Sequence, residues 1–210
     1  MYLGRLCFIT DPLLSDLSFE DMTRKVLKGG FRWIQYRDKF RTRREIYEEA
    51  LRLRKLTKDF NGVFIVNDYV DIAFCTNADG VHLGQNDLPI KEARKIMGKK
   101  KIIGISTHNL EQAINAEKEG ADYIGFGPVF KTTTKDAGEP KGTEILKDVK
   151  KRVKIPVVAI GGINLENIMS VLTTGVDAIA IASAILKGDI DRNIKEFLEI
   201  LLNYGKQKRA

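Results

Sequence analysis

The run Gln35-Tyr36-Arg37-Asp38-Lys39 has residue types that bind phosphorylated ligands. It lies at the end of a predicted strand, so alternation directs Gln35, Arg37 and Lys39 to one side. Arginine binds phosphate through two hydrogen bonds and lysine acts as a point charge, so this side suits a phosphate or diphosphate. A solvated charged loop is the alternative interpretation.

Two aspartates, Asp68 and Asp87, follow the next two predicted strands and are expected near these cations. Mg²⁺ commonly takes one or two protein carboxylates and completes its shell with water and phosphate oxygens. Helix capping is the alternative, because Asp68 precedes an apolar helix and Asp87 precedes Pro89. Two carboxylates beside a cationic clamp favour the metal interpretation.

A second, neutral anion site is predicted at the other end of the chain. Gly161-Gly162 and Ala182-Ser183 each follow a predicted strand, and the second pair precedes a short helix. Glycines let a phosphate approach the backbone, and N–H groups at a helix start point at the anion. The run Thr132-Thr133-Thr134-Lys135 lies in the long connection 131–142, which we expect to close over the site as a lid; an ordinary polar loop is the alternative.

Ser106 and His82 are the remaining polar candidates on predicted strands. Ser106 is expected to donate a hydrogen bond to a phosphate. The sequence offers no acidic partner for an activated nucleophile, so a hydrolase triad is rejected. His82 is interpreted as a buried, hydrogen-bonded histidine rather than a direct catalyst.

These residues require strands that alternate with helices. Short apolar runs bounded by turn residues predict the strands. They are Leu6–Thr10, Trp33–Tyr36, Val63–Asn67, Gly80–Leu83, Ile102–Ser106, Tyr123–Gly127, Val157–Ile160 and Ala178–Ala182. Amphipathic periodicity predicts helices in the intervening segments. They include Arg43–Phe60, Leu110–Glu119, Thr143–Arg152, Leu165–Thr173 and Asp191–Leu202.

Turn and cap residues agree with this division. Asn109, Asn164 and Asp189 lie where N-caps are expected, and glycines follow helix ends. Eight strand–helix units fill the 210 residues, which favours a closed barrel over an open doubly wound sheet. The predicted fold class is therefore α/β, a single-domain (β/α)₈ TIM barrel with eight parallel strands over residues 1–210. In such a barrel the active site lies at the strand C-termini.

Composition restricts the partners. The formal charge is +7, from 35 basic and 28 acidic residues, and it is interpreted as solubility or a preference for anionic small molecules. Nucleic acid is not expected, because the basic clusters contain no interleaved aromatics. No apolar run is long enough to cross a membrane, and no signal peptide is seen. Cys7 and Cys75 are isolated, which fits a reducing cytoplasm. The sequence leaves the oligomeric state open, a homo-oligomer included.

Together these motifs resemble the thiamine phosphate synthase family over essentially the whole chain. The motifs include Gly80-Val81-His82-Leu83-Gly84-Gln85-Asn86-Asp87 and Ile160-Gly161-Gly162-Ile163 as well as the runs named above. The resemblance implies a Mg²⁺-dependent transferase. Hydroxymethylpyrimidine diphosphate would lose pyrophosphate, and the nitrogen of a thiazole phosphate would capture the resulting cation, giving thiamine phosphate.

The resemblance also implies roles for individual residues. Those implied to bind the pyrimidine diphosphate are Gln35, Tyr36, Arg37, Asp38, Lys39, Asn67, Ser106 and Lys135, with Arg37, Ser106 and Lys135 catalytic. Those implied to bind the thiazole phosphate are Thr132, Thr133, Thr134, Gly162, Ala182 and Ser183. Asp68 and Asp87 would hold Mg²⁺.

Two alternatives remain. The related thiazole tautomerases commonly carry a histidine where this chain has Pro128, and they often lack the Asn-Asp pair and the diphosphate clamp that are present here. A catalytically silent ligand-binding or regulatory homologue would have no need of Asp68, Asp87 and Lys135. One departure from the synthases is Lys131, where they usually have proline.

Overall fold

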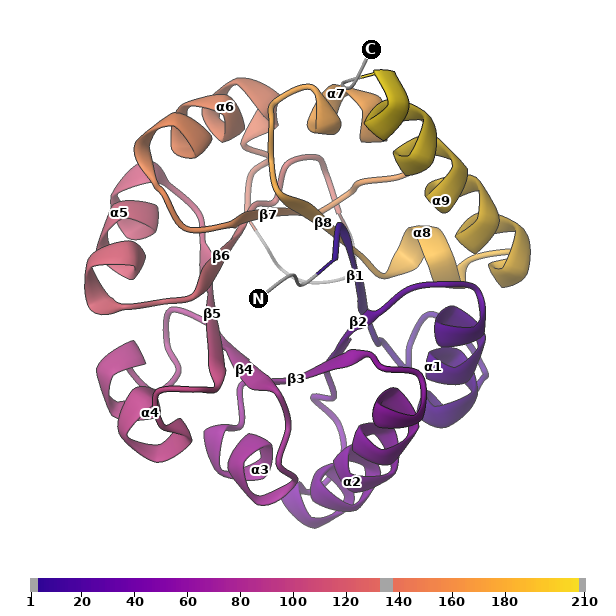
Figure 1. Ribbon diagram of the computed structural model, residues 1–210, viewed down its shortest axis with the longest axis vertical. Helices are drawn as coiled ribbons and strands as arrows, with labels where there is room; N and C mark the ends of the chain where they lie inside the picture. The colour runs from indigo at the N-terminus through magenta and orange to yellow at the C-terminus, as the bar shows by residue number, and fades with distance from the viewer. Residues whose placement is uncertain (1–3, 133–137, 208–210) are drawn as a thin grey trace.

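The computed structural model describes residues 4–132 and 138–207, and its strands form a closed parallel barrel in chain order (Figure 1). The strands are β1 (Leu6–Ile9), β2 (Trp33–Tyr36), β3 (Val63–Asn67), β4 (Gly80–Leu83), β5 (Ile102–Thr107), β6 (Tyr123–Phe126), β7 (Val157–Ile160) and β8 (Ala178–Ile181). The barrel closes where β1 pairs with β8, with Cys7 opposite Ala180. The predicted (β/α)₈ fold class is confirmed, and the domain boundaries 1–210 stay a prediction.

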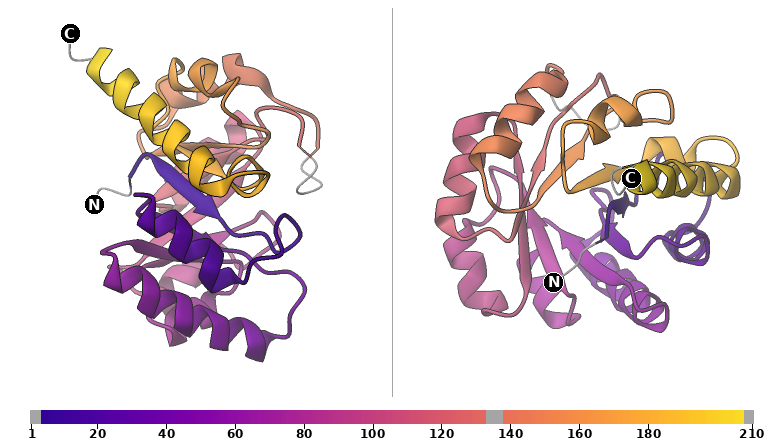
Figure 2. Two further views of the ribbon diagram at one scale, coloured as in Figure 1. Left: turned by 90° about the vertical axis from the view of Figure 1, so that its right-hand side faces the viewer. Right: turned by 45° about the horizontal axis from the view of Figure 1, so that its top comes forward.

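Helices surround the barrel on its outside (Figure 1). They are α1 (Phe19–Lys28), α2 (Arg43–Asp59), α3 (Val70–Cys75), α4 (Ile90–Met97), α5 (Leu110–Glu119), α6 (Gly142–Arg152), α7 (Ile168–Leu172), α8 (Ser183–Leu186) and α9 (Ile190–Gln207). Figure 2 shows from the side that the long helix α9 lies outside the barrel, next to α1. Within the described ranges, no helix is long and apolar enough to cross a membrane.

The core has two layers because side chains alternate along each strand. On β1, Leu6 and Phe8 belong to the layer between the strands and the helices. Cys7 and Ile9 belong to a smaller cluster inside the barrel, together with Trp33. These side chains fill the interior of the barrel toward the N-terminal ends of the strands. The C-terminal ends of the strands are left free to form a pocket.

Most boundaries agree with the sequence predictions. Every predicted strand is present, and no strand end differs from its prediction by more than one residue. The helix predicted over Leu165–Thr173 is shorter, and Asn164 is not its N-cap. Asn164 Oδ1 instead accepts hydrogen bonds from the N–H groups of Glu166 and Asn167, which forms a turn, so α7 begins only at Ile168. The final helix is longer than predicted and extends to Gln207.

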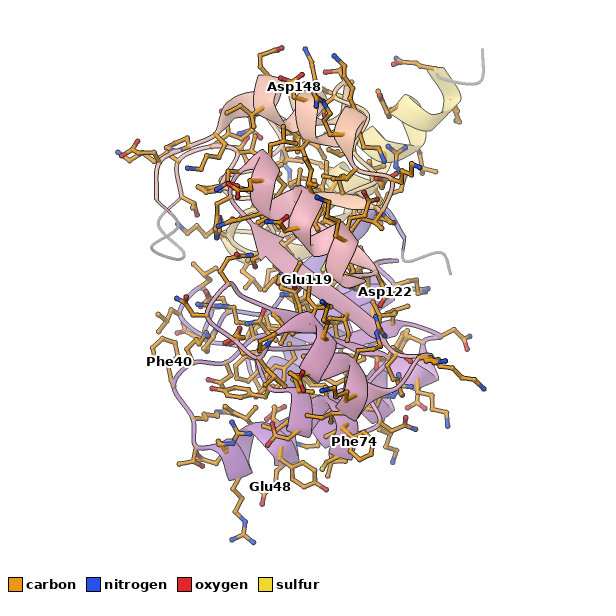
Figure 3. The ribbon with its side chains drawn as sticks, turned by 90° about the vertical axis from the view of Figure 1, so that its left-hand side faces the viewer. Phe40, Glu48, Phe74, Glu119, Asp122 and Asp148 are labelled. Atoms are coloured by element: carbon orange, nitrogen blue, oxygen red, sulfur yellow. The ribbon has the colours of Figure 1, made fainter. Side chains whose placement is uncertain are left out.

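The end of the barrel opposite the pocket is held by three aspartates that precede β4, β6 and β8. Each accepts a hydrogen bond from a backbone N–H of the preceding strand and forms an ion pair with a basic side chain of a helix. The sets are Asp79 with Phe64 N–H and Arg54, Asp122 with Ile103 N–H and Arg94, and Asp177 with Val157 N–H and Lys150. Figure 3 shows Asp122 at this end and Phe40 at the other. This end therefore contributes stability, as expected for the N-terminal face of such barrels.

Candidate active site

A pocket lies at the C-terminal ends of the strands, where the sequence analysis expected a site. Nine of the predicted site residues line it. They are Gln35, Arg37, Asn67, Asp68, Ser106, Thr132, Gly162, Ala182 and Ser183. These residues come from both ends of the chain, and barrel closure between β1 and β8 brings them together.

Tyr36 and Asp38 face away from this pocket. Tyr36 is buried, packs edge-on against Phe19 and donates a hydrogen bond to Asp38. Burial, followed by the charges of Asp38 and Glu49, raises the pKa of the Tyr36 phenol well above its usual value, so it keeps its proton. Asp38 accepts from the N–H groups of Phe40 and Arg41. The structure therefore places both side chains in support of the loop after β2.

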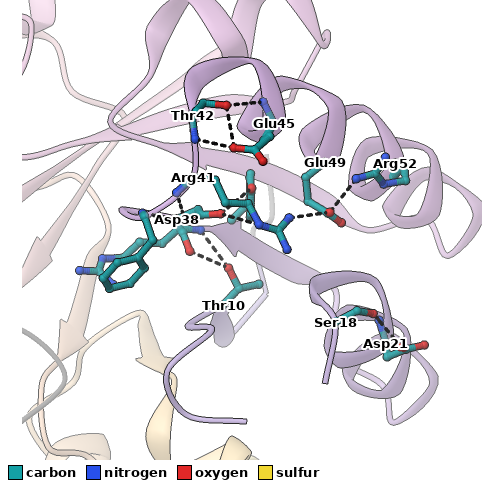
Figure 4. A network of polar contacts seen from close by, with 12 residues as sticks. Thr10, Ser18, Asp21, Asp38, Arg41, Thr42, Glu45, Glu49 and Arg52 are labelled. Atoms are coloured by element: carbon teal, nitrogen blue, oxygen red, sulfur yellow. Dashed lines mark hydrogen bonds and ion pairs between the residues drawn. The ribbon is translucent and has the colours of Figure 1, made fainter. Parts of the chain in front are cut away.

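Arg41 connects that loop to the following helix. Its guanidinium lies between Asp38, at 3.7 Å, and Glu49, at 3.0 Å (Figure 4). Thr42 and Glu45 then form a capping box at the start of α2, in which each side chain bonds to the other residue's backbone N–H. These contacts fix the backbone that carries Arg37 and Lys39.

Gln35 and Asn67 form a buried amide pair on the wall of the pocket. Gln35 Nε2 donates to Asn67 Oδ1 at 2.7 Å. The Cys7 thiol donates to Gln35 Oε1 over 3.9 Å. Burial raises the pKa of the Cys7 thiol well above its usual value, so the thiol stays protonated. These partners fix the orientation of both amides before a ligand arrives.

Arg37 is held by the end of the first strand. Its guanidinium pairs with Asp11 at 3.4 Å, and its backbone N–H donates to Thr10 Oγ1 at 3.0 Å. Asp11 is nearly inaccessible and also lines the pocket. Asp11 was not among the residues predicted from the sequence, although its position after the first predicted strand was a usable signal.

Asp68 and Asp87 form a close carboxylate pair. Asp68 adopts a left-handed conformation with φ of 68°, and it forms an ion pair with Lys39. Asp87 accepts from the Gly84 N–H at 2.6 Å. Burial raises the pKa of Asp87, and the nearby charge of Asp68 and a hydrogen bond with it raise it further, while the Gly84 N–H and Lys39 oppose the shift. Two like charges at one place favour a bound cation.

This pair suits Mg²⁺ better than a metal that requires many protein ligands. Within residues 4–132 and 138–207, no group of three or more His, Cys, Asp or Glu side chains could hold a metal. Mg²⁺ typically binds one or two carboxylates and completes its shell with water and phosphate oxygens. Asp68 Oδ2 is buried and makes no hydrogen bond within the described residues, although it lies beside Lys39. The residues present fit this ion.

His82 and Ser106 are in contact at the centre of the pocket wall. His82 Nε2 lies 3.0 Å from Ser106 Oγ, and His82 Nδ1 lies 2.8 Å from the Tyr123 hydroxyl. Ser106 is further held by Gln85, whose amide donates to its backbone carbonyl. His82 is therefore buried and hydrogen bonded, as predicted, but it also lines the pocket.

His108 is a second pocket residue that the sequence analysis did not select. Its Nδ1 lies 2.7 Å from the carbonyl oxygen of Gly127. It follows Ser106 by two residues, and this spacing directs both toward the same side of β5. That spacing was the signal that could have found it.

The glycines after β7 form a tight backbone surface. Gly161 and Gly162 have φ of 98° and 66°, conformations that strongly favour glycine. A Cβ atom at Gly162 would lie 2.5 Å from the carbonyl oxygen of Lys131, so packing as well as conformation requires glycine there. Ser183 begins α8 across the pocket, where the first N–H groups of a helix have no partners within the helix.

The segment after β6 completes the rim. Pro128 lines the pocket, as does Thr132. The base of the connection is fixed, since Lys141 and Gly142 donate backbone hydrogen bonds to Pro128 and Val129. Thr133, Thr134 and Lys135 lie outside the described residues.

Comparison with known proteins identifies the family of this chain. Residues 6–185 match the family model described as thiamine monophosphate synthase. A thiamine-phosphate synthase of Clostridium novyi is 49% identical over 88% of this chain and 92% of its own, and one of Methanosarcina barkeri is 43% identical over 92% and 88%. The solved thiamine phosphate pyrophosphorylase of Pyrococcus furiosus superposes with a TM-score of 0.89 at 42% identity, covering 96% of this chain and 97% of its own. The chain belongs to the thiamine monophosphate synthase family.

Proposed function

We propose that this chain, which has the function of a thiamine-phosphate synthase, is a Mg²⁺-dependent transferase that alkylates a thiazole phosphate with hydroxymethylpyrimidine diphosphate. One observation carries the proposal. The pocket at the strand C-termini has two different ends: Arg37 and Asp68 line it at β2–β3, with Lys39 and Asp87 next to Asp68 outside the lining, and backbone of glycine and Ser183 lines it at β7–β8. Two phosphorylated substrates with their reacting atoms between them fit this arrangement.

The cationic end binds the diphosphate. Arg37 and Lys39 supply positive charge, and the Ser106 hydroxyl supplies a further hydrogen bond. Lys135 joins them from the segment after β6, a role that rests on the family resemblance. Tyr36 and Asp38 support the loop from behind and are not part of this contact set.

Asp68 and Asp87 would hold Mg²⁺, which when bound neutralises charge on the departing pyrophosphate. Lys39 forms an ion pair with Asp68, which places its ammonium group beside these carboxylates, where the diphosphate would bind. The buried Gln35–Asn67 amide pair, which also lines this pocket, orients the pyrimidine ring through hydrogen bonds.

The reaction exchanges one bond for another. The bond between the pyrimidine CH₂ carbon and the diphosphate oxygen breaks, and its electron pair leaves with pyrophosphate. The thiazole nitrogen then donates its lone pair to the same carbon, giving thiamine phosphate. Arg37, Lys39 and Ser106 contribute by stabilising charge that grows on the departing group, which is the interaction that accelerates such a step.

The neutral end binds the thiazole phosphate. Gly162, Ala182 and Ser183 line this end together with Thr132. The resemblance adds Thr133 and Thr134. A neutral site separates this phosphate from the cationic end, so each substrate has its own place and the two do not compete.

The alternative activities differ in what they require. A tautomerase acts on a thiazole substrate alone, and a silent homologue turns over nothing. Pro128 in the pocket wall cannot transfer a proton, whereas the tautomerases commonly carry histidine there. The metal-binding pair and the clamp favour the synthase over both.

An omission experiment tests the proposal. The protein is incubated with both substrates and Mg²⁺, with each component left out in turn, and thiamine phosphate is measured by conversion to fluorescent thiochrome. We expect product only in the complete mixture, and loss of product on addition of a chelator that excess Mg²⁺ reverses. Product formation without the diphosphate, or without Mg²⁺, would contradict the proposal.

We also propose that the reaction takes place in the cytoplasm. Both cysteines are free in the structure, Cys7 buried and Cys75 exposed, and an exposed free thiol is compatible with a reducing compartment.

A further inference from the structure

We propose that Tyr123 is a positioning residue, which sets the tautomer of His82 and thereby makes the Ser106 hydroxyl a hydrogen-bond donor toward the substrate. The inference rests on the proposed role of Ser106 in binding the diphosphate. It is carried by a continuous contact from the barrel interior to the pocket, in which Tyr123 Oη lies 2.8 Å from His82 Nδ1 and His82 Nε2 lies 3.0 Å from Ser106 Oγ.

The Tyr123 hydroxyl has one proton and one place to donate it. Tyr123 is 1% exposed and packs edge-on against Trp33 among apolar side chains. Within residues 4–132 and 138–207 its hydroxyl makes no hydrogen bond except to His82. A buried donor left without an acceptor is costly, so the phenol donates to Nδ1.

The hydrogen bond from Tyr123 fixes the direction of the hydrogen bond between His82 and Ser106. If Nδ1 accepts, the neutral imidazole carries its proton on Nε2. Nε2–H then donates to Ser106 Oγ, because a hydrogen bond needs one donor. The Ser106 proton is then not used in the hydrogen bond with His82. Because Ser106 lines the pocket, its hydroxyl can donate this proton to a diphosphate oxygen. In the opposite tautomer, Nε2 would accept the hydrogen bond from the Ser106 hydroxyl. Ser106 would then present only oxygen lone pairs to an anion in the pocket.

Glycines on the neighbouring strands make room for the rings of Tyr123 and His82. A Cβ atom at Gly104 would lie 2.1 Å from the Tyr123 ring, and one at Gly125 would lie 3.2 Å from the His82 ring. A phenylalanine at position 123 would fill the same apolar space without needing a partner for a hydroxyl. In the part of the chain that the structure describes, the hydroxyl's hydrogen bond is with His82, the residue that touches Ser106.

The second histidine provides an internal reference. His108 Nδ1 faces the Gly127 carbonyl oxygen at 2.7 Å, and a carbonyl only accepts, so His108 carries its proton on Nδ1. The chain has two histidines, and the structure assigns them opposite tautomers.

The tautomers are measured by long-range ¹H–¹⁵N NMR on protein labelled at histidine, with the signals assigned through a His108→Gln variant. We expect the Nε2–H form for His82 and the Nδ1–H form for His108. In Tyr123→Phe, His82 should shift toward the Nδ1–H form while His108 is unchanged. A wild-type His82 in the Nδ1–H form, or a tautomer unaffected by Tyr123→Phe, would overturn the inference.

Kinetics test the consequence at Ser106. Tyr123→Phe should lower kcat/KM for the diphosphate by about 3- to 10-fold, the size of one hydrogen bond, and leave the KM for thiazole phosphate unchanged. Tyr204→Phe is the matched control. It also removes one buried phenol hydroxyl, which donates to the Leu172 carbonyl far from the pocket, so it should lower Tm without changing kinetics. Equal kinetics in the two variants would overturn the inference.

A double variant separates this inference from the proposed function. If Tyr123 acts through Ser106, adding Tyr123→Phe to Ser106→Ala should cause no further loss, and additive losses would overturn the inference. If Ser106→Ala alone has normal kcat/KM, Ser106 leaves the proposed function and the kinetic part of the inference fails with it. In contrast, a normal Tyr123→Phe beside an impaired Ser106→Ala removes the inference and leaves the proposed function standing.

Discussion

The Asp11 carboxylate lies 3.4 Å from the Arg37 guanidinium, although 26 residues separate them along the chain. Asp11 is nearly inaccessible to solvent, and its carboxylate orients the Arg37 guanidinium. Arg37 still lines the pocket. The segment that follows β1 therefore supports the proposed diphosphate site without supplying a cation of its own.

Asp11→Asn should raise the KM for the pyrimidine diphosphate by about tenfold, since Arg37 loses a charged partner worth roughly 1.5–3 kcal/mol of orientation. The KM for thiazole phosphate should not change, because the site proposed for that phosphate is at the other end of the pocket. Steady-state kinetics with each substrate varied in turn check this. Equal changes in both KM values would show that Asp11 supports the fold rather than Arg37.

Asp68→Asn and Asp87→Asn should each lower kcat by at least about 100-fold and raise the Mg²⁺ concentration needed for half-maximal activity. The reason is that the metal's contribution to charge neutralisation is worth several kcal/mol. Asp87→Asn removes one charge from a repelling pair, so it should not lower Tm; Asp68→Asn also loses the partly exposed ion pair with Lys39, so it should change Tm only slightly. The metal assignment would be wrong if both variants kept the wild-type dependence on Mg²⁺.

Ser183→Asp should raise the KM for thiazole phosphate by about tenfold or more, because a carboxylate there repels the substrate's phosphate. An acidic residue in the first turn of a helix is favourable, so the fold should tolerate it. Ser183→Asn, of similar shape and without charge, is the control and should have a much smaller effect. A similar rise in both variants would mean that size rather than charge is responsible. Gly162 is unsuitable for this test, since any side chain there meets the Lys131 carbonyl.

Asp79→Ala should destabilise the protein by about 1–3 kcal/mol, because it leaves the Phe64 N–H and the Arg54 guanidinium without their partner. Glu92→Ala, which removes an exposed ion pair with Lys95, should change the free energy of unfolding by less than about 1 kcal/mol. Denaturant unfolding of both variants compares them, and kcat should be unchanged because both residues lie away from the pocket. A similar free energy of unfolding for the two variants would argue against a stabilising role for Asp79.

The strands were predictable because each is a short apolar run with turn residues at both ends, and the barrel followed from their number. The ends of helices that are set by side-chain contacts were less predictable. Asn164 has the residue type of an N-cap, but the turn it forms delays α7 by several residues.

Part of the pocket lining was predictable where a polar residue lies at the end of a strand or directly after it. Gln35, Arg37 and Asn67 all line the pocket. Contacts between distant strands were not, because pairing depends on how the barrel closes. The sequence gives no sign that Tyr123 touches His82, 41 residues away.

Tyr36 and Asp38 show a different limit. They belong to the run that was predicted to bind the diphosphate, but alternation at the end of β2 turns them toward the helices, where Tyr36 packs against Phe19. A motif identifies a functional segment, and the direction of each side chain then decides which of its residues can meet the substrate.

The most direct test of the central claim is ³¹P NMR of wild-type protein with both substrates and Mg²⁺. We predict that the two diphosphate signals are replaced by the single signal of inorganic pyrophosphate, while the monoester phosphate of the thiazole is retained in thiamine phosphate. Asp68→Asn with Asp87→Asn should leave both diphosphate signals unchanged over the same period. Release of inorganic phosphate in place of pyrophosphate, or loss of the diphosphate without formation of thiamine phosphate, would contradict the account.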